Sequence, residues 1–80
     1  RIDGVLETDN DIYIMEMKYK SCDKDTAPED KDELLSTAID EAFTQIEERG
    51  YAKPYMASDK RIRKVAIAVT GRDDVSVREA

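Results

Sequence analysis

The chain has 80 residues, enough for a single small domain, 1–80, with a modest hydrophobic core. Thirteen basic and nineteen acidic residues give a net charge of −6, the wrong sign for a protein that binds nucleic acid by surface charge alone. A hydrophobic fraction of 40% excludes a disordered chain, and the sequence shows neither a membrane span nor a signal peptide. Its single cysteine and lack of histidine exclude an internal disulfide, a thiolate zinc cluster and imidazole chemistry, and they favour a cytoplasmic protein. Because the chain starts at Arg1 on a strand-like pattern, we expect a fragment of a longer protein.

The first two predicted strands form a hairpin. Apolar residues alternate with others from Ile2 to Glu7, and the string TDND follows at positions 8–11 before a second apolar run begins at Ile12. Asp and Asn are favoured in tight turns because they tolerate left-handed backbone and bond their own main chain. The turn is therefore expected near residues 9 and 10.

The second strand carries charges where burial is expected. In the string IYIMEMK, residues 12–18, alternate side chains share a face, which places Glu16 and Lys18 on the same side as two isoleucines. The other side is apolar as well, so the pattern indicates a central strand in a sheet covered on both faces. Charged groups in such a strand are disfavoured unless they are paired, lie at an edge or bind a metal.

A helix is predicted after a charged connection. The string SCDKDTAPEDKDE, residues 21–33, predicts an exposed loop that feeds a helix somewhere after Pro28. From Leu35 to Ile46 apolar residues recur at spacings of three and four, which is typical of an amphipathic helix, and Gly50 is well placed to end it.

Two more strands complete the expected layout. After an irregular turn, residues 65–69 are apolar throughout and predict a buried strand, and residues 75–79 predict a short strand at an edge. The order strand, strand, helix, strand and a last strand indicates a mixed α/β fold with one sheet and a crossover helix.

Three charged residues of the hairpin are candidates for a metal site. A turn centred near residues 9 and 10 would bring Asp3 beside Glu16, so that two carboxylates converge. Mg²⁺ and Mn²⁺ prefer oxygen ligands, and Lys18 would point into the same space, where it could orient a water or stabilise charge on a phosphate. The alternative is a plain ion pair between Glu16 and Lys18, with Asp3 as a surface residue.

Three segments together resemble the PD-(D/E)XK nuclease superfamily, namely RIDGVLETDNDIYIMEMKY, AIDEAFTQIEERGYAKPY and KVAIAV. The resemblance is in particular to the nuclease-like domain found C-terminal to AAA-type ATPase domains in bacteria and archaea. The resemblance runs from Arg1 to about Val69, apart from the charged insertion at 21–33. It implies a restriction-endonuclease-like mixed sheet that lacks the first helix and strand of the family core. The missing helix would leave one sheet face uncovered, which favours self-association into a homo-oligomer, exchange of segments or an incomplete site.

The resemblance also implies a function and a set of site residues. By matching position, Asp3 and Glu16 bind Mg²⁺ or Mn²⁺, and Lys18 acts on the attacking water or on the phosphate. Gln45 corresponds to a family glutamine near the site. The expected activity is metal-dependent hydrolysis of phosphodiester bonds in nucleic acid, with DNA as the expected substrate, an AAA-type ATPase domain in the parent chain and no membrane partner.

Two other readings stay open beside the nuclease. One is a nuclease fold without activity that serves as a binding or regulatory module of an ATPase-containing protein, since a fold does not guarantee its chemistry. The other is a purely structural α/β fragment with a surface ion pair and no divalent ion.

Several residues have plainer expected roles when the resemblance is set aside. Gln45 beside an apolar stripe is more often a helix-surface residue, and Tyr51 and Tyr55 after a helix usually pack on a core. Cys22 is incidental, because it has no partner for nucleophilic chemistry. The run KRIRK, residues 60–64, could contact phosphate, but a solvated strand start is the more common structure.

Overall fold

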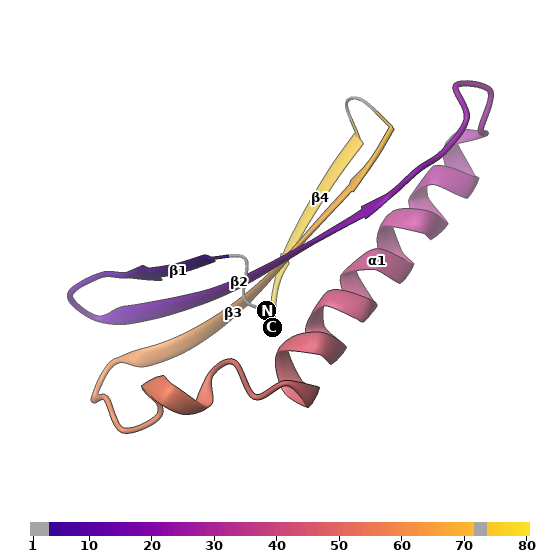
Figure 1. The fold of residues 1–80 in the computed structure, drawn as a ribbon. Helices are drawn as coiled ribbons and strands as arrows, with labels where there is room; N and C mark the ends of the chain where they lie inside the picture. Colours follow the sequence, from indigo (N-terminus) through magenta and orange to yellow (C-terminus); the bar gives the residue numbers. More distant parts are fainter. Residues whose placement is uncertain (1–3, 72–73) are drawn as a thin grey trace.

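The computed structural model of the chain describes residues 4–71 and 74–80 (Figure 1). In these ranges the elements are β1 (Gly4–Glu7), β2 (Asp11–Lys20), α1 (Pro28–Glu48), the short 3₁₀ helix η1 (Lys53–Tyr55), β3 (Arg61–Thr70) and β4 (Asp74–Glu79). Their order is the strand, strand, helix, strand, strand layout predicted from the sequence, so the α/β fold is confirmed.

The four strands form one mixed sheet in the order β1-β2-β3-β4. The central strands β2 and β3 are parallel and stay paired over ten residues, from Asp11 with Arg61 to Lys20 with Thr70. The two outer pairs are antiparallel. Because a parallel pair needs a crossover connection, the chain leaves β2, runs back through α1 and η1, and enters β3.

The hairpin between β1 and β2 has the predicted register. Gly4 lies opposite Met15, and the turn falls at residues 8–11. Thr8 closes this turn, because its hydroxyl accepts from the Asp11 amide at 3.0 Å while its own amide donates to the Asp11 carbonyl at 2.8 Å. A side chain that bonds the main chain in this way stabilises the turn, and no residue of the turn adopts the positive φ that favours glycine.

Helix α1 begins earlier than the apolar pattern indicated. Pro28 lies in its first turn and is followed by two acidic residues. Proline at the first helical position and negative charge near the helix N-terminus both stabilise a helix start. The predicted loop therefore covers residues 21–27, and the prediction of a helix that starts near Pro28 is confirmed. Gly50, with φ of 61°, follows the last turn as expected.

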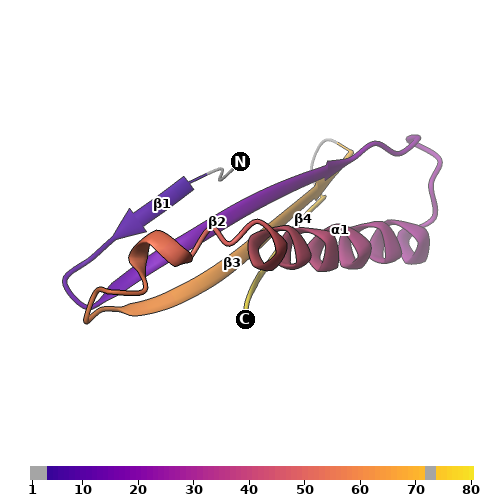
Figure 2. The same ribbon diagram turned by 60° about the horizontal axis from the view of Figure 1, so that its bottom comes forward.

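The core lies between α1 and the central strands, along which α1 runs in both views (Figures 1 and 2). Two buried clusters fill this layer. One contains Ala38, Ile39, Ala42, Ala66 and Ala68, and the other contains Ile12, Ile14 and Ile46. The predicted helical stripe is thus confirmed. Because the side chains that β3 places in the first cluster are the small residues Ala66 and Ala68, the helix can approach that strand closely.

The described residues leave the other side of the sheet uncovered. Five side chains on this side are between 50% and 61% exposed, and we call this side the open face. They are Leu6, Met17, Tyr19, Val75 and Val77. The prediction of a sheet covered on both faces is therefore wrong within residues 4–71 and 74–80, although the apolar alternation that suggested it is real. In the same ranges, no helix is long and apolar enough to cross a membrane.

Candidate active site

Glu16 is a buried carboxylate on a strand face that is otherwise apolar. Its side chain is 3% exposed and lies on the same side of β2 as Ile12 and Ile14, beneath α1. The alternation of the strand dictates this position, because even-numbered residues of β2 all face the helix. Burial of a carboxylate is unfavourable unless its charge is compensated, so a neighbouring cation is needed.

Lys18 supplies that cation from the next position on the same face. Its Nζ lies 3.9 Å from Oε2 of Glu16, and its side chain is 30% exposed. The predicted sharing of one face by Glu16 and Lys18 is therefore confirmed. Lys18 also reaches across to α1, where its Nζ donates a hydrogen bond to Oε1 of Gln45. The ammonium group thus bridges a buried carboxylate and a partly buried amide.

The amide of Gln45 continues the chain of contacts to Tyr51. Its Nε2 donates to the Tyr51 hydroxyl at 3.1 Å. An ammonium group can only donate hydrogen bonds, so the amide must present its oxygen to Lys18 and its nitrogen to Tyr51. We call Glu16, Lys18, Gln45 and Tyr51 the polar chain.

Tyr51 has more than the packing role predicted for it. Its ring packs against the buried cluster that contains Ile46, as expected for an aromatic residue after a helix. Its hydroxyl, however, is a partner of Gln45. Sequence reasoning missed this contact because it depends on how the chain turns back after Gly50, which no spacing in the sequence reveals.

A cleft of about 610 Å³ opens beside the polar chain, between the second half of β2 and α1. Lys18 and Gln45 line it together with Lys20 and Arg49, and Asp40, Glu41 and Glu48 add acidic groups. Lys20 is held by Glu41, with Nζ 2.6 Å from Oε2. Basic and acidic side chains therefore balance in the lining of the cleft, although the chain as a whole is acidic.

Asp3, the other predicted metal ligand, lies outside the described residues. The hairpin pairing is described as far as Gly4 with Met15, the residue before Glu16. Within 4–71 and 74–80, no group of three or more His, Cys, Asp or Glu side chains is placed to hold a metal ion. Placement of the two carboxylates together therefore stays a prediction.

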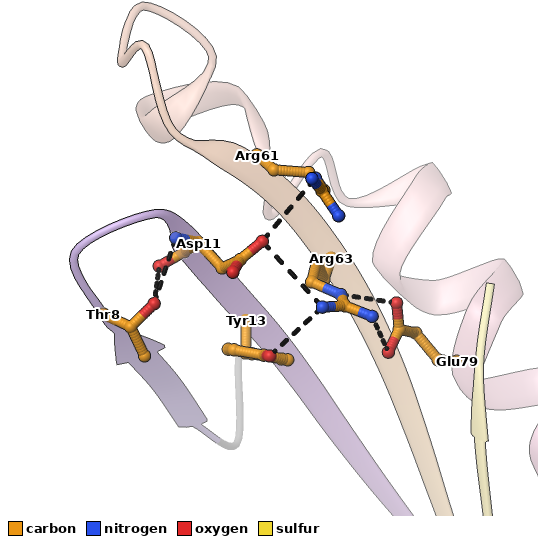
Figure 3. Close-up of polar contacts among 6 residues, drawn as sticks. All are labelled: Thr8, Asp11, Tyr13, Arg61, Arg63 and Glu79. Carbon is orange, nitrogen blue, oxygen red and sulfur yellow. Dashed lines mark hydrogen bonds and ion pairs between the residues drawn. The ribbon is translucent and has the colours of Figure 1, made fainter.

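The basic run 60–64 is tied to carboxylates at the start of β3. Figure 3 shows the part of this network around Arg63, whose guanidinium donates to both carboxylate oxygens of Glu79 and lies over the ring of Tyr13. The hydrogen bond to Glu79 raises the pKa of Arg63 above its ordinary value. The pairs are Lys60 with Glu7, Arg61 with Asp11, Arg63 with Glu79, and Lys64 with Glu47. These contacts agree with a solvated, ion-paired strand start.

The fold and the Glu16–Lys18 pair together define a nuclease-like α/β domain, and comparison with known proteins identifies the family. The model of the PD-(D/E)XK nuclease superfamily matches residues 1–79. The chain belongs to this superfamily, and its mixed sheet with one covering helix is a restriction-endonuclease-like fold. Glu16, Met17 and Lys18 have the (D/E)XK spacing of the family name. Among curated proteins and solved structures, no match was found.

Proposed function

We propose that the chain is a metal-dependent nuclease that hydrolyses phosphodiester bonds, with DNA as its substrate. The observation that carries the proposal is the buried Glu16 carboxylate beside Lys18 on the helix-facing side of β2. Ordinary ion pairs lie at the surface, where both groups stay hydrated and contribute little to stability. A carboxylate held under a helix and next to an open cleft is more easily explained by chemistry than by stability.

A divalent cation suits the donor groups that the chain offers. Glu16 supplies hard carboxylate oxygens, and Asp3 is the second ligand in this proposal. Mg²⁺ is commonly held by one or two carboxylates, with waters and substrate phosphate in the remaining positions, and Mn²⁺ accepts the same ligands. When bound, such an ion would lower the pKa of a water molecule and offset the negative charge of the phosphate.

The remaining members of the polar chain act on the phosphate and on one another. The Lys18 ammonium stabilises the negative charge that develops on the phosphate oxygens as a water attacks phosphorus and the ester oxygen departs. Gln45 accepts from that ammonium and holds it at the cleft, and Tyr51 fixes the orientation of the Gln45 amide. Gln45 and Tyr51 are positioning residues in this scheme, because they act through Lys18.

The cleft and the composition support the rest of the proposal. Lys20 and Arg49 can contact phosphates on either side of the bond that is cut. Because the chain has a net charge of −6, we expect weak affinity for DNA in the absence of a divalent ion. We further propose a parent protein with an AAA-type ATPase domain that works in the cytoplasm, where the single cysteine would stay reduced.

A second candidate is an inactive nuclease fold that serves as a binding or regulatory module of such an ATPase-containing protein, because a fold does not guarantee its chemistry. A domain that binds the ion weakly, or binds it without cutting DNA, would fit that candidate better than the nuclease.

The test combines metal binding with cleavage on the same samples. Mn²⁺ is titrated by calorimetry into the wild type, the Asp3→Asn variant and the Glu16→Gln variant, and each sample is then assayed for nicking of supercoiled plasmid and cutting of single-stranded RNA. We expect the wild type to bind the ion and nick the plasmid, and both substitutions to abolish binding and nicking.

The matched control is Glu47→Gln, which removes the same charge from the exposed face of α1, where Glu47 pairs with Lys64. This variant should bind Mn²⁺ and nick DNA like the wild type. Ion binding without cleavage in the wild type would favour the inactive module. Cleavage that survives Glu16→Gln would show that the carboxylate site is wrongly assigned.

A further inference from the structure

The open face has the composition of a buried layer. Its five exposed apolar side chains come from three strands, β1, β2 and β4, so they extend over the sheet rather than forming one local cluster. Register brings them together, since Val75 lies opposite Val69 and Val77 lies opposite Ile67 on β3. Single exposed apolar residues are ordinary, but a contiguous apolar patch on a sheet marks an interaction surface.

The dimensions of the molecule agree with a missing layer. The chain exposes 5504 Å², whereas a compact monomer of 9.1 kDa is expected to expose roughly 4,900 Å². The radius of gyration is 14.1 Å, against roughly 11.6 Å for a compact 80-residue domain. The shortest dimension, 17 Å, is about that of one sheet and one helix. About 600 Å² of surface is therefore exposed beyond what the size of the chain requires.

The open face is also close to neutral. Its charged groups near the start of β3 form two opposite pairs, Arg63 with Glu79 through hydrogen bonds of 2.6 and 3.0 Å, and Arg61 with Asp11 at 3.8 Å (Figure 3). The chain as a whole carries a net charge of −6. The acidic excess therefore lies elsewhere, and two such faces can meet without the like-charge repulsion that other parts of the surface would impose.

We propose that the open face packs against the open face of a second copy of this chain to form a symmetric dimer. Two copies that each buried this excess of about 600 Å² would bury about 1,200 Å² in total, the lower end of the range for specific interfaces. A two-fold contact needs a self-complementary patch, and a neutral apolar sheet face satisfies that requirement. The two sheets would then stack as in a β-sandwich, with α1 of each copy on the outside.

The dimer leaves the candidate active site accessible. Met17 and Tyr19 point to the open face, while Glu16 and Lys18 point to the opposite side of the same strand. Most of the contact between copies therefore lies on the side of β2 opposite Glu16 and Lys18, and Tyr19, at the end of the strand, is the open-face residue that also borders the cleft. The proposal does not depend on nuclease activity, and its test uses none.

The oligomeric state is measured by sedimentation over protein concentrations from about 1 μM to about 1 mM. We expect the wild type to be a dimer and its melting temperature to rise with protein concentration. Met17→Lys should raise the dimer dissociation constant at least about tenfold, because the interface would bury an unpaired charge from each copy. Met56→Lys is the matched control, since Met56 is 68% exposed but lies outside the open face.

A second variant covers the case in which a lysine at position 17 prevents folding. Val77→Thr preserves the shape and the strand preference of the side chain, and it should weaken the dimer while the circular dichroism spectrum stays that of the wild type. A wild type that is monomeric at about 1 mM overturns the proposal. A dimer whose dissociation constant is unchanged by both Met17→Lys and Val77→Thr also overturns the proposal. Assembly into species that grow without limit overturns it as well.

Discussion

The hydroxyl of Tyr51 allows the polar chain to be tested with the loss of a single oxygen. In Tyr51→Phe the ring stays in its apolar cluster, and the acceptor for Gln45 Nε2 disappears. A partly buried hydrogen bond of this kind contributes about 0.5–1.5 kcal/mol. If that free energy is used to hold Lys18 in place, kcat for plasmid nicking should fall roughly two- to twelvefold, because 1.36 kcal/mol is a factor of ten in rate.

The two kinetic constants should respond differently. Tyr51 is not among the residues that line the cleft within the described ranges, so KM should stay close to the wild-type value. A nuclear magnetic resonance spectrum of the Gln45 side-chain amide gives a readout that needs no catalysis. Its two proton signals should shift and exchange faster with water once the tyrosine oxygen is gone.

Tyr55→Phe is the matched control for this variant. Tyr55 packs on the same apolar cluster, and its hydroxyl is not a member of the polar chain. The same chemical change at this position should leave the Gln45 signals and kcat unchanged. Tyr51→Phe that matches the wild type in both the spectrum and kcat would refute the positioning role. If the wild type itself does not cut DNA, the spectrum still tests the Gln45–Tyr51 contact.

Three further variants test the packing. Ile39→Ala should lower the free energy of unfolding by about 2–5 kcal/mol in urea denaturation, because Ile39 is 1% exposed and the cavity cannot fill completely. Gly50→Ala should cost about 1–2 kcal/mol in the same assay, since φ of 61° strains a residue with a side chain, and a smaller loss than for Ile39→Ala is expected. Glu79→Gln, which weakens the exposed pair with Arg63, should change stability by less than about 1 kcal/mol, and a larger loss would show that this pair is more important than exposed ion pairs usually are.

Local patterns in the sequence predicted most of the fold. The two-residue period of β2 and the turn residues at 8–11 determined which side chains share a face and which residues pair in the hairpin. The start of α1 was predicted only as somewhere after Pro28, because residues 28–33 have no apolar stripe that would fix its first residue. Pro28 followed by acidic residues was the available signal, since both features favour the first turn of a helix.

The candidate site was predictable only in part. The pairing of Glu16 with Lys18 follows from the strand period, and the structure agrees. The contact of Lys18 with Gln45 joins residues 27 positions apart, and it depends on where α1 crosses the sheet, so only the family resemblance pointed to it. The apolar alternation of β2 wrongly indicated cover on both faces, because an apolar strand face indicates burial without saying which molecule provides the cover. The uncovered face was expected only from the family resemblance, which implied that a helix is missing.

The division of β2 into two faces makes the candidate site depend on strand alignment. A slip of one residue against β3 would turn Met17 and Tyr19 toward the helix and expose Glu16 and Lys18 on the other side. Such a slip would replace three charged side chains and two isoleucines beneath the helix with two methionines and two tyrosines, so hydrophobic burial alone does not discriminate against it. Ten consecutive paired residues between β2 and β3, together with the closed turn at Thr8, provide that discrimination. We therefore expect substitutions in the turn to disturb the candidate site in a protein that still folds, because they would misalign the strand that carries Glu16 and Lys18.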